Sequence, residues 1–388
     1  MNKLVFAANR CNSYQKALAD EFSRIYGDGY KYIAMTPFFG GEPIPGVRDL
    51  NYEPYVLRAY ESQNAMSEAR RIINESECAV IGGDPKYLQL ISGRLRDGKI
   101  TFLYSERFFK GPLWKDIARF VKYYRYFGAR DCAHNPRSKF YLLCSSAFAA
   151  WDYGLCGLFR NKAYRWGYFP EAKRYDDIDG LISRKKEASI LWAGRYVGWK
   201  HPEFAVRLAK NLRGMGLRFT LRITGSGVME KELQNLIDNS GLNDCISLNT
   251  GRTVQPEEIR AEMENAQIFI FTSDRGEGWG VVLNEAMNSG CAVVAGNKIG
   301  AVPYLINDGH NGIIFRDCDI DDLTQKVAGL LRDSERTNNL RRNAYGTVTG
   351  EWSPRNAAQR FVTLSEALRD SDAVSLWDNG PGSPAPVM

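Results

Sequence analysis

Short apolar runs alternate with amphipathic stretches along most of the chain. The apolar runs, which we take as strands, are Leu4–Ala8, Tyr32–Met35, Cys78–Ile81, Ile100–Tyr104 and Phe140–Cys144 in the first half, and Ile190–Ala193, Phe219–Thr224, Ile246–Leu248, Ile268–Thr272 and Cys291–Ala295 in the second. Helical periodicity lies between them, for example over Tyr14–Tyr26, Glu203–Leu212, Met229–Asn239 and Pro256–Asn265. This alternation favours parallel sheets covered by helices on both faces. The pattern therefore predicts an α/β fold with two doubly wound, Rossmann-like domains.

The alternation is interrupted once, around Phe169–Lys186, by Pro170 and a charged stretch. We therefore expect an N-terminal domain over residues 1–172 and a C-terminal domain over residues 186–352. A helix over residues 353–369 is expected to pack back toward the N-terminal domain. Residues 370–388 are rich in Gly and Pro and are predicted to be a disordered tail without a packing role.

Composition narrows the class of protein. Of the 388 residues, 44% are hydrophobic and 25% charged, which is ordinary globular usage and excludes a disordered or fibrous chain. Eight scattered cysteines without a Cys-x-x-Cys pair are typical of buried free thiols, and not of a disulfide framework or a zinc site. A formal charge of +6 does not call for nucleic acid, but it suits a phosphate-bearing ligand or an anionic membrane surface.

The sequence also bears on location. The N-terminal apolar run is too short for a signal peptide, and no segment reaches the roughly 18 apolar residues of a spanning helix. We expect a cytoplasmic protein, bound at most to the inner face of the membrane. Residues 107–139 are basic and aromatic, and one helical face would carry Leu113, Ile117, Phe120, Val121, Tyr124 and Phe127. Such a helix could lie on anionic lipid, but an ordinary sheet-covering helix would show the same pattern.

Candidate chemistry gathers at strand ends in the second half. In open α/β sheets, ligands bind beyond the carboxyl ends of strands. The run ending at Ala193 is followed by Gly194, Arg195 and Lys200. Arginine offers a bidentate fork to phosphate and lysine a mobile point charge. Two solvated loop cations would look the same in isolation.

The next strand end carries Gly225 and Gly227, where the backbone can approach a ligand closely. A dinucleotide fingerprint would need a small residue at the position of Glu230, so the sequence disfavours an NAD-dependent dehydrogenase.

A third strand end leads through the turn Gly276–Gly280 into a helix that is closed by Gly290. The start of a helix exposes amide groups that suit a phosphate. Glu277 lies in the turn and Glu285 about one and a half turns into the helix, so both carboxylates could accept hydrogen bonds from a hydroxyl-rich ligand. The alternative is that Glu277 caps the helix and Glu285 is a solvated surface residue.

Together these segments resemble glycosyltransferase family 4, which has the GT-B fold of two Rossmann-like domains facing a central cleft. The matching pieces are AGR…K at residues 193–200, TGSG, EGWGVVLNE at residues 277–285 and EAMNSGCAVVAG. In the first half, YSER and WGYFP look like pieces of bacterial capsule and exopolysaccharide glycosyltransferases. The resemblance implies a retaining, metal-independent hexosyltransferase-type enzyme of polysaccharide biosynthesis. It would have no cofactor, a nucleotide-diphosphate sugar as donor, and a saccharide or lipid-linked saccharide as acceptor.

The resemblance also implies residue roles. Arg195 and Lys200 would hold the pyrophosphate, Glu277 would contact the transferred sugar, and these three are the catalytic candidates. Glu285 would bind the ribose hydroxyls. The other donor-binding candidates are Gly194, Gly225, Gly227, Arg252, Thr253, Val254, Gly278, Trp279, Gly280 and Val281.

The acceptor-side candidates in the first half are Gly82, Gly83, Glu106 and Arg107. The family's usual N-domain catalytic histidine has no match among His134, His201 and His310. A sugar-nucleotide epimerase of the same fold, or a non-catalytic nucleotide-sugar-binding module, remain as alternatives.

Overall fold

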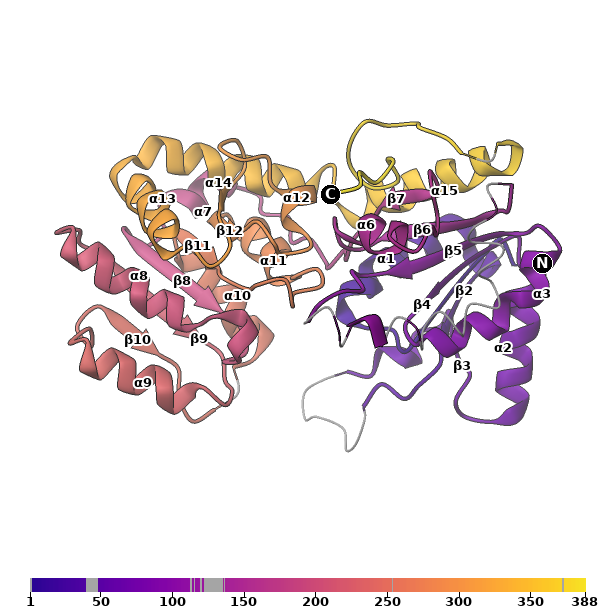
Figure 1. The fold of residues 1–388 in the computed structure, drawn as a ribbon, viewed down its shortest axis with the longest axis horizontal. Helices are drawn as coiled ribbons and strands as arrows, with labels where there is room; N and C mark the ends of the chain where they lie inside the picture. The colour runs from indigo at the N-terminus through magenta and orange to yellow at the C-terminus, as the bar shows by residue number, and fades with distance from the viewer. Residues whose placement is uncertain are drawn as a thin grey trace. The chain divides into compact units, whose positions relative to one another are not determined.

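The structure, a computed structural model, describes residues 2–39, 48–111, 114, 116–118, 121, 135, 137–252, 254–371 and 373–388 (Figure 1). The chain divides into two compact units. The N-unit comprises residues 1–171 and 354–388, and the C-unit comprises residues 172–353. Each unit is built around its own sheet, and each is described separately.

The N-unit holds a seven-stranded sheet in the order β3-β2-β1-β4-β5-β6-β7, and every neighbouring pair of strands is parallel. The strands are β1 (Leu4–Ala8), β2 (Tyr30–Ala34), β3 (Val56–Arg58), β4 (Cys78–Gly82), β5 (Ile100–Ser105), β6 (Phe140–Cys144) and β7 (Ala163–Arg165). Single-turn 3-10 helices occupy Gly27–Gly29 and Leu50–Tyr52, and a longer one spans Pro85–Ile91.

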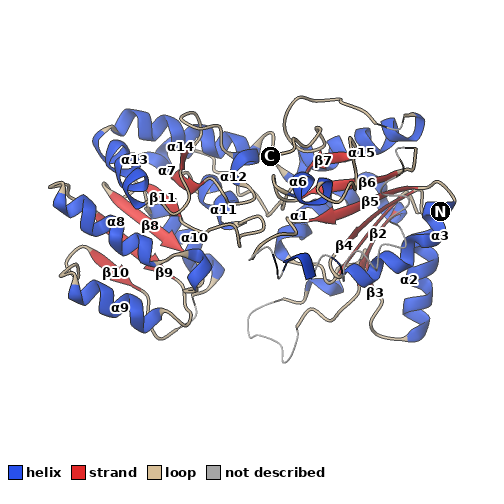
Figure 2. Ribbon diagram, in the orientation of Figure 1, coloured by secondary structure: helices blue, strands red, loops and turns tan. Residues whose placement is uncertain are grey.

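Helices cover both faces of this sheet (Figure 2). On one face α1 (Ser13–Tyr26) and α15 (Pro354–Asp370) pack together over aromatic side chains, where Phe361 meets Phe22 and Phe102. The other face is largely aliphatic and is covered by α2 (Gln63–Glu75), α3 (Ser92–Arg96) and α6 (Ala149–Gly154). The side chains of Asn12 and Ser62 accept hydrogen bonds from the first turns of α1 and α2, which fixes where these helices begin.

The C-unit holds a six-stranded parallel sheet in the order β10-β9-β8-β11-β12-β13. Its strands are β8 (Ser189–Ala193), β9 (Thr220–Thr224), β10 (Ile246–Leu248), β11 (Ile268–Phe271), β12 (Ala292–Gly296) and β13 (Ile313–Phe315). Its helices are α7 (Ile178–Ser183), α8 (Glu203–Gly214), α9 (Glu230–Asn239), α10 (Pro256–Asn265), α11 (Val282–Asn288), α12 (Val302–Leu305), α13 (Ile320–Arg332) and α14 (Ser334–Thr349), with a 3-10 turn at Gly198–Lys200.

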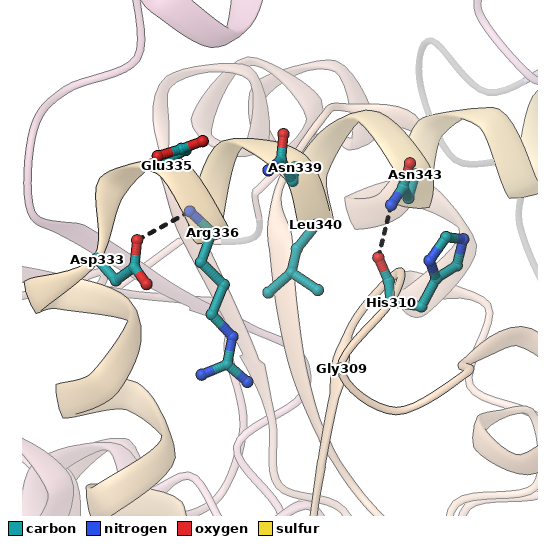
Figure 3. Close-up of a pocket in the computed structure, with 8 residues that line it drawn as sticks. All are labelled: Gly309, His310, Asp333, Glu335, Arg336, Asn339, Leu340 and Asn343. Atoms are coloured by element: carbon teal, nitrogen blue, oxygen red, sulfur yellow. Dashed lines mark hydrogen bonds between the residues drawn. The ribbon is translucent and has the colours of Figure 1, made fainter.

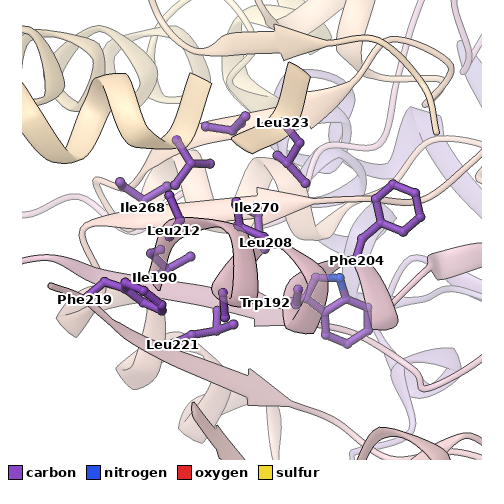
Figure 4. Packing of buried hydrophobic residues seen from close by; sticks show 14 of the residues in the cluster. Ile190, Trp192, Phe204, Leu208, Leu212, Phe219, Leu221, Ile268, Ile270 and Leu323 are labelled. Carbon is purple, nitrogen blue, oxygen red and sulfur yellow. The ribbon is translucent and has the colours of Figure 1, made fainter. Parts of the chain in front are cut away.

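The C-unit core lies between its sheet and three helices, α8, α9 and α13 (Figure 4). Every second residue of the central strands enters it, for example Ile190 and Trp192 of β8, and Ile268 and Ile270 of β11. Successive side chains of a strand point to opposite faces of the sheet, so every second residue faces this core. Helices α11 and α14 pack together, and α14 also contacts β12. The buried strands hold the loops at their carboxyl ends in fixed positions.

All ten predicted strands are present, with ends that differ by at most two residues. The pattern missed β3, β7 and β13. Each of these has three residues and lies at the edge of its sheet, where a strand has a neighbour on one side only; β10 has the same length and an edge position, and it was predicted. The predicted class, two doubly wound Rossmann-like α/β sheets, is confirmed.

The C-terminal segment differs from the predicted disordered tail. Pro384 bridges Tyr164 of β7 in antiparallel fashion, and the Arg165 amide donates to the Ser383 carbonyl at 2.7 Å. Ser383 is fully buried, and Trp377 lies 4.9 Å below the Arg360 guanidinium of α15. The prediction was wrong because an edge strand has backbone groups to satisfy, and the tail satisfies those of β7. The glycines that looked like disorder signals turn the chain back, since Gly380 and Gly382 have φ values of 79° and 82°.

Several expectations concern features of the whole chain. The seven cysteines in the described ranges are free thiols, four of them buried. Within those ranges no cluster of His, Cys, Asp and Glu could hold a metal ion, and no helix has the length and apolarity to cross a membrane. His134 and most of the basic, aromatic segment 107–139 lie outside the described residues.

Candidate functional site

The C-unit sheet has its topological switch point between β8 and β11. From this pair the strand order runs outward in opposite directions, which opens a crevice at the carboxyl ends of the two strands. The loop after β8 carries Arg195 and Lys200, and the turn after β11 carries Glu277. The three catalytic candidates thus follow the two strands where the fold favours a ligand.

Lys200 and Glu277 form an ion pair in this crevice. Lys200 Nζ lies 2.6 Å from Glu277 Oε2, and each side chain is only 12% exposed. Ser273 Oγ donates a second hydrogen bond to the same oxygen at 3.1 Å. At this exposure the charges are screened less than at a free surface. The structure therefore brings the predicted cation and the predicted acid into direct contact.

Trp199 supports both cations. The Arg195 guanidinium carbon lies 5.4 Å from the Trp199 ring centroid, and Lys200 Nζ lies 4.6 Å from it. Cations are attracted to the face of an indole at these distances. Arg195 is exposed and has no carboxylate partner in the part of the chain that the structure describes. Its charge is therefore available to an anion.

The glycines after β9 serve the packing of two loops. A Cβ on Gly225 would lie 1.8 Å from the Gly194 carbonyl oxygen, and one on Gly227 would lie 2.5 Å from the Tyr196 carbonyl oxygen. The amides of Gly194 and Tyr196 donate across to Thr224 and Ser226 at 3.0 and 2.9 Å. The glycines predicted that the backbone would closely approach a partner, and in the structure that partner is the loop that carries Arg195. A ligand contact at Gly225 and Gly227 stays a prediction.

The turn after β11 exposes backbone and buries its tryptophan. The Trp279 indole is 1% exposed and donates to Asn284 Oδ1 at 2.9 Å, so its side chain belongs to the core. Gly280 has φ 93°, and a Cβ there would lie 2.6 Å from the Phe271 ring. Among the described residues, the amides of Gly278, Gly280 and Val281 donate to no protein acceptor. As predicted, Gly290 ends the helix, with φ 67°.

Glu285 is a carboxylate held without a partner. It lies in α11, partly buried, and no hydrogen bond or ion pair reaches its carboxylate within the described ranges. Burial raises its pKa, and the charge of Arg260 opposes that rise. A desolvated acid with a perturbed pKa and no structural partner is typical of a functional site.

The segment after β10 offers less to a ligand. The Arg252 guanidinium pairs with Glu258 at 2.7 Å, and the Val254 side chain is buried. Thr253 lies outside the described residues. Asn249 has a clearer position, since its amide nitrogen donates to the carbonyls of Gly225 and Arg252 at 2.9 and 3.1 Å. It ties this segment to the glycine loop.

The acceptor-side candidates belong to the N-unit. Glu106, at the end of β5, accepts a hydrogen bond from Tyr168 Oη at 2.8 Å and pairs with Lys110. Arg107 is buried, with its guanidinium 4.6 Å from the Phe148 ring and its Nε 4.0 Å from Asp152. Both carboxylate oxygens of Glu106 thus have protein partners just after β5, and the position of Arg107 is that of a structural residue.

Gly82 is the last residue of β4, and Gly83 follows it. A Cβ on Gly82 would lie 2.8 Å from the Tyr104 ring, and one on Gly83, where φ is 89°, would lie 2.7 Å from Asn9 Oδ1. Both glycines are thus required by close packing at the carboxyl end of the sheet.

Sequence reasoning missed Trp199, Thr272 and Ser273. Thr272 Oγ1 donates to the Lys200 and His201 carbonyls at 2.8 and 3.0 Å, and so holds the cation loop against β11. The signal was available, because Thr272 and Ser273 directly follow a buried strand at the switch point. Trp199 gave no signal beyond its place beside Lys200.

A second hollow in the C-unit lies elsewhere (Figure 3). It is lined by Gly309, His310, Asp333, Glu335, Arg336, Asn339, Leu340 and Asn343. Gly309 and His310 lie in the loop before β13, so this hollow lies toward the amino ends of the parallel strands. None of the predicted site residues lines it.

Comparisons with known proteins find similarity mainly in the C-unit. The family described as "Glycosyl transferases group 1" matches residues 174–347. The putative colanic acid biosynthesis glycosyltransferase WcaL of Salmonella typhimurium is 30% identical over 170 residues, which are 42% of this chain and 41% of that protein. A GDP-mannose-dependent alpha-(1-6)-phosphatidylinositol monomannoside mannosyltransferase of Mycolicibacterium smegmatis is 27% identical over 188 residues, 47% of this chain and 48% of that protein. These matches thus span less than half of each curated relative.

The fold is shared over a greater length. The crystal structure of Anabaena Alr3699/HepE in complex with UDP superposes with a TM-score of 0.67, over 94% of this chain and 100% of that one. The sequence identity is 15%, so this likeness concerns the fold alone. The family match falls on the unit that carries Lys200 and Glu277. Residues 174–347 are therefore similar to the group 1 glycosyl transferases, and the fold of the chain is that of the GT-B glycosyltransferases.

Proposed function

We propose that this protein transfers a sugar from a nucleotide-diphosphate sugar, with retention of anomeric configuration, to a saccharide or lipid-linked saccharide. The observation that carries the proposal is the grouping at the C-unit switch point. There the exposed Arg195 and the paired Lys200 lie on one tryptophan, and the Glu277 acid contacts the lysine. Binding of a diphosphate requires cations, and binding of a sugar requires a hydrogen-bond acceptor for its hydroxyl groups, which the Glu277 carboxylate provides.

The leaving group accounts for the cations. Cleavage of the bond between the anomeric carbon and phosphate leaves a nucleoside diphosphate with new negative charge. Fixed donors aimed at that charge stabilise the transition state more than the ground state. Arg195 supplies a guanidinium, Lys200 an ammonium, and Gly278, Gly280 and Val281 supply amides without protein acceptors in the described ranges. In this account the cations act where other transferases use a divalent ion.

Lys200 has to serve two anions. Without donor, Glu277 neutralises it at 2.6 Å. A bound diphosphate would share the ammonium, and Glu277 would then turn an oxygen toward a sugar hydroxyl. An acid held on the phosphate side of the sugar is poorly placed as a general base on the opposite face. This supports retention, and not a single inverting displacement.

Glu285 and the N-unit supply the remaining roles. Glu285 has a free carboxylate in the described structure, which suits the ribose hydroxyls. Glu106, oriented by Tyr168, is the N-unit group that we assign to the acceptor. The backbone at Gly82 and Gly83 lies at the carboxyl end of β4, the strand that neighbours β5 in the same sheet. Similarity to WcaL supports a role in cell-surface polysaccharide synthesis. A role in capsule synthesis, a cytoplasmic location and binding to the inner face of the membrane remain predictions from the sequence.

The test is turnover with a panel of UDP- and GDP-sugars, with and without saccharide acceptors, in the presence of EDTA. We expect a glycosylated product whose anomeric configuration, read by proton NMR, matches that of the donor. Release of a rearranged nucleotide sugar without acceptor would identify an epimerase instead. Binding of every donor without turnover would identify a non-catalytic module.

A further inference from the structure

His201 lies between the two loops that form the proposed donor site. Its Nδ1 is 2.9 Å from Glu203 Oε1, and its Nε2 is 3.3 Å from Asp274 Oδ2. An ionised carboxylate only accepts hydrogen bonds, so both ring nitrogens must donate. The geometry therefore calls for a doubly protonated, positively charged ring. Nothing in the sugar transfer proposed above uses this ring.

Asp274 shapes the turn that presents Glu277. Its Oδ1 accepts from the Gly276 amide at 2.7 Å, and its carbonyl accepts from the Glu277 amide at 3.1 Å. Its own amide donates to the Trp199 carbonyl at 3.0 Å. One residue thus organises the acidic turn and joins it to the cation loop. The other carboxylate oxygen of Asp274 is the one that His201 holds.

The backbone of His201 is strained. It has φ 49° and ψ 54°, the left-handed region, which costs a residue other than glycine about 1 kcal/mol or more. In this conformation the carbonyls of Lys200 and His201 both accept from Thr272 Oγ1, at 2.8 and 3.0 Å. The strain is therefore kept at the residue that follows Lys200, and it brings the cation loop against the end of β11.

We propose that His201 is a positioning residue of the donor site, whose ring bridges Glu203 and Asp274 and so fixes the Lys200 loop relative to the Glu277 turn. This inference rests on the proposed function, because it concerns the geometry of the same site. Loss of one ring proton removes one of the two bridges. Donor binding then becomes dependent on pH through a residue that does not touch the donor.

The surroundings of the ring favour its charged form. Glu203 faces it from α8, Asp274 from the turn after β11, and Asp317 and Cys318 lie nearby, after β13. The hydrogen bond to Glu203 raises the pKa of His201 most; Asp274 adds to the rise, and burial opposes it. The bridge is therefore complete below the pKa of His201 and opens as the pH rises through it. Lys298 acts on Asp317 and lowers the pKa of that acid, against the effect of burial.

The test combines His201→Asn with the matched control His310→Asn. Asparagine tolerates the left-handed backbone but cannot carry the charge. His310 lines the hollow of Figure 3, which lies toward the amino ends of the C-unit strands and not at the carboxyl ends where the donor site is proposed. UDP and GDP binding would be followed by calorimetry from about pH 5.5 to about pH 9, the range around the ordinary histidine pKa. Imidazole NMR would follow ring titration in the wild type and in Asp274→Asn.

We expect wild-type affinity to fall about tenfold as the ring loses its proton, since small misplacements at a site of this kind have large effects. His201→Asn should bind weakly at every pH and keep only the pH dependence that comes from the terminal phosphate of the nucleotide, whose pKa is about 6, and His310→Asn should match the wild type. In Asp274→Asn the ring should titrate at a lower pH. A purely structural histidine would lower the melting temperature of His201→Asn and leave its pH profile like the wild type.

The outcomes separate the two claims. If UDP or GDP binds but its affinity follows the same pH profile in the wild type and in His201→Asn while the wild-type ring titrates, the role of His201 is wrong and the proposed function stands. A ring that is singly protonated throughout this range also contradicts the bridge. If neither nucleotide binds the wild type at any pH, the proposed function fails, and the role of His201 fails with it.

Discussion

The two units have similar strand orders but different chemistry at their switch points. In the C-unit, the crevice between β8 and β11 is flanked by Arg195, Lys200 and Glu277. In the N-unit, the corresponding place between β1 and β4 has the neutral amide of Asn9, whose Oδ1 accepts from the Asp84 amide at 3.3 Å beside Gly83. The topology supplies a ligand crevice in both sheets. The side chains that follow the strands decide which ligand it suits, and in the N-unit the charged Arg10 and Asp84 stand beside Asn9 and Gly83 in the chain.

The largest expected effect comes from the charged side of this comparison. Lys200→Ala should lower kcat/KM by about 10³-fold, because it removes a fixed cation where the diphosphate gains charge. Steady-state kinetics with the active donor would measure it. Lys326→Ala is the matched control, since Lys326 also pairs with a carboxylate, Asp322, at 2.9 Å in the same unit. Comparable rates in the two variants would remove Lys200 from the mechanism.

Two glycine variants sharpen the comparison further. Gly225→Ala places a methyl group 1.8 Å from the Gly194 carbonyl, so the loop that carries Arg195 has to move. We expect a loss of about 2–4 kcal/mol in unfolding free energy together with weaker nucleotide binding. Gly83→Ala, which is also strained, should destabilise the N-unit and spare nucleotide binding. Equal effects of both variants on nucleotide affinity, measured by calorimetry, would contradict the separation of roles.

Glu285→Gln should stabilise the protein while lowering donor affinity. Burial raises the pKa of Glu285, so the folded state binds its proton more tightly than the unfolded state. The ionised carboxylate therefore destabilises the fold above the ordinary glutamate range, near pH 4.3, and this penalty disappears as the pH falls below it. Melting temperatures of the wild type and Glu285→Gln at about pH 7 and about pH 3, each about a unit or more from that range, would test the sign. Glu232→Gln, at an exposed position of α9, should change neither quantity.

The smallest effect on the chemistry is expected from the tail. A chain that stops after Asp370 loses the cover of the β7 edge, including the 2.7 Å bond from the Arg165 amide to Ser383. We expect a lower melting temperature by a few degrees, at about 1 kcal/mol per lost hydrogen bond, and faster amide exchange in β7. Nucleotide binding in the C-unit should stay unchanged. An unchanged exchange rate in β7 would mean that the tail contributes no cover.

Local pattern was enough for the central strands and for the residues that follow them. Strand ends such as Ala193 can be located because buried parallel strands form continuous apolar runs. Contacts made across the fold could not be read from the sequence. The contact between His201 and Asp274 could not be predicted from spacing, because 73 residues separate the two partners. The sequence also does not show that the Trp199 ring lies against both Arg195 and Lys200. The tail was misjudged because glycine and proline signal turns as well as disorder.

The central claim is that fixed cations at the C-unit switch point bind a diphosphate, and affinity for UDP compared with UMP tests it most directly. Calorimetry on the wild type should show UDP binding about 10-fold or more tightly than UMP, since charge-assisted phosphate contacts are among the stronger hydrogen bonds. In Arg195→Ala, UDP should lose most of that advantage while UMP affinity changes little. Equal affinity of the wild type for both nucleotides, or an unchanged UDP advantage in Arg195→Ala, would contradict the account.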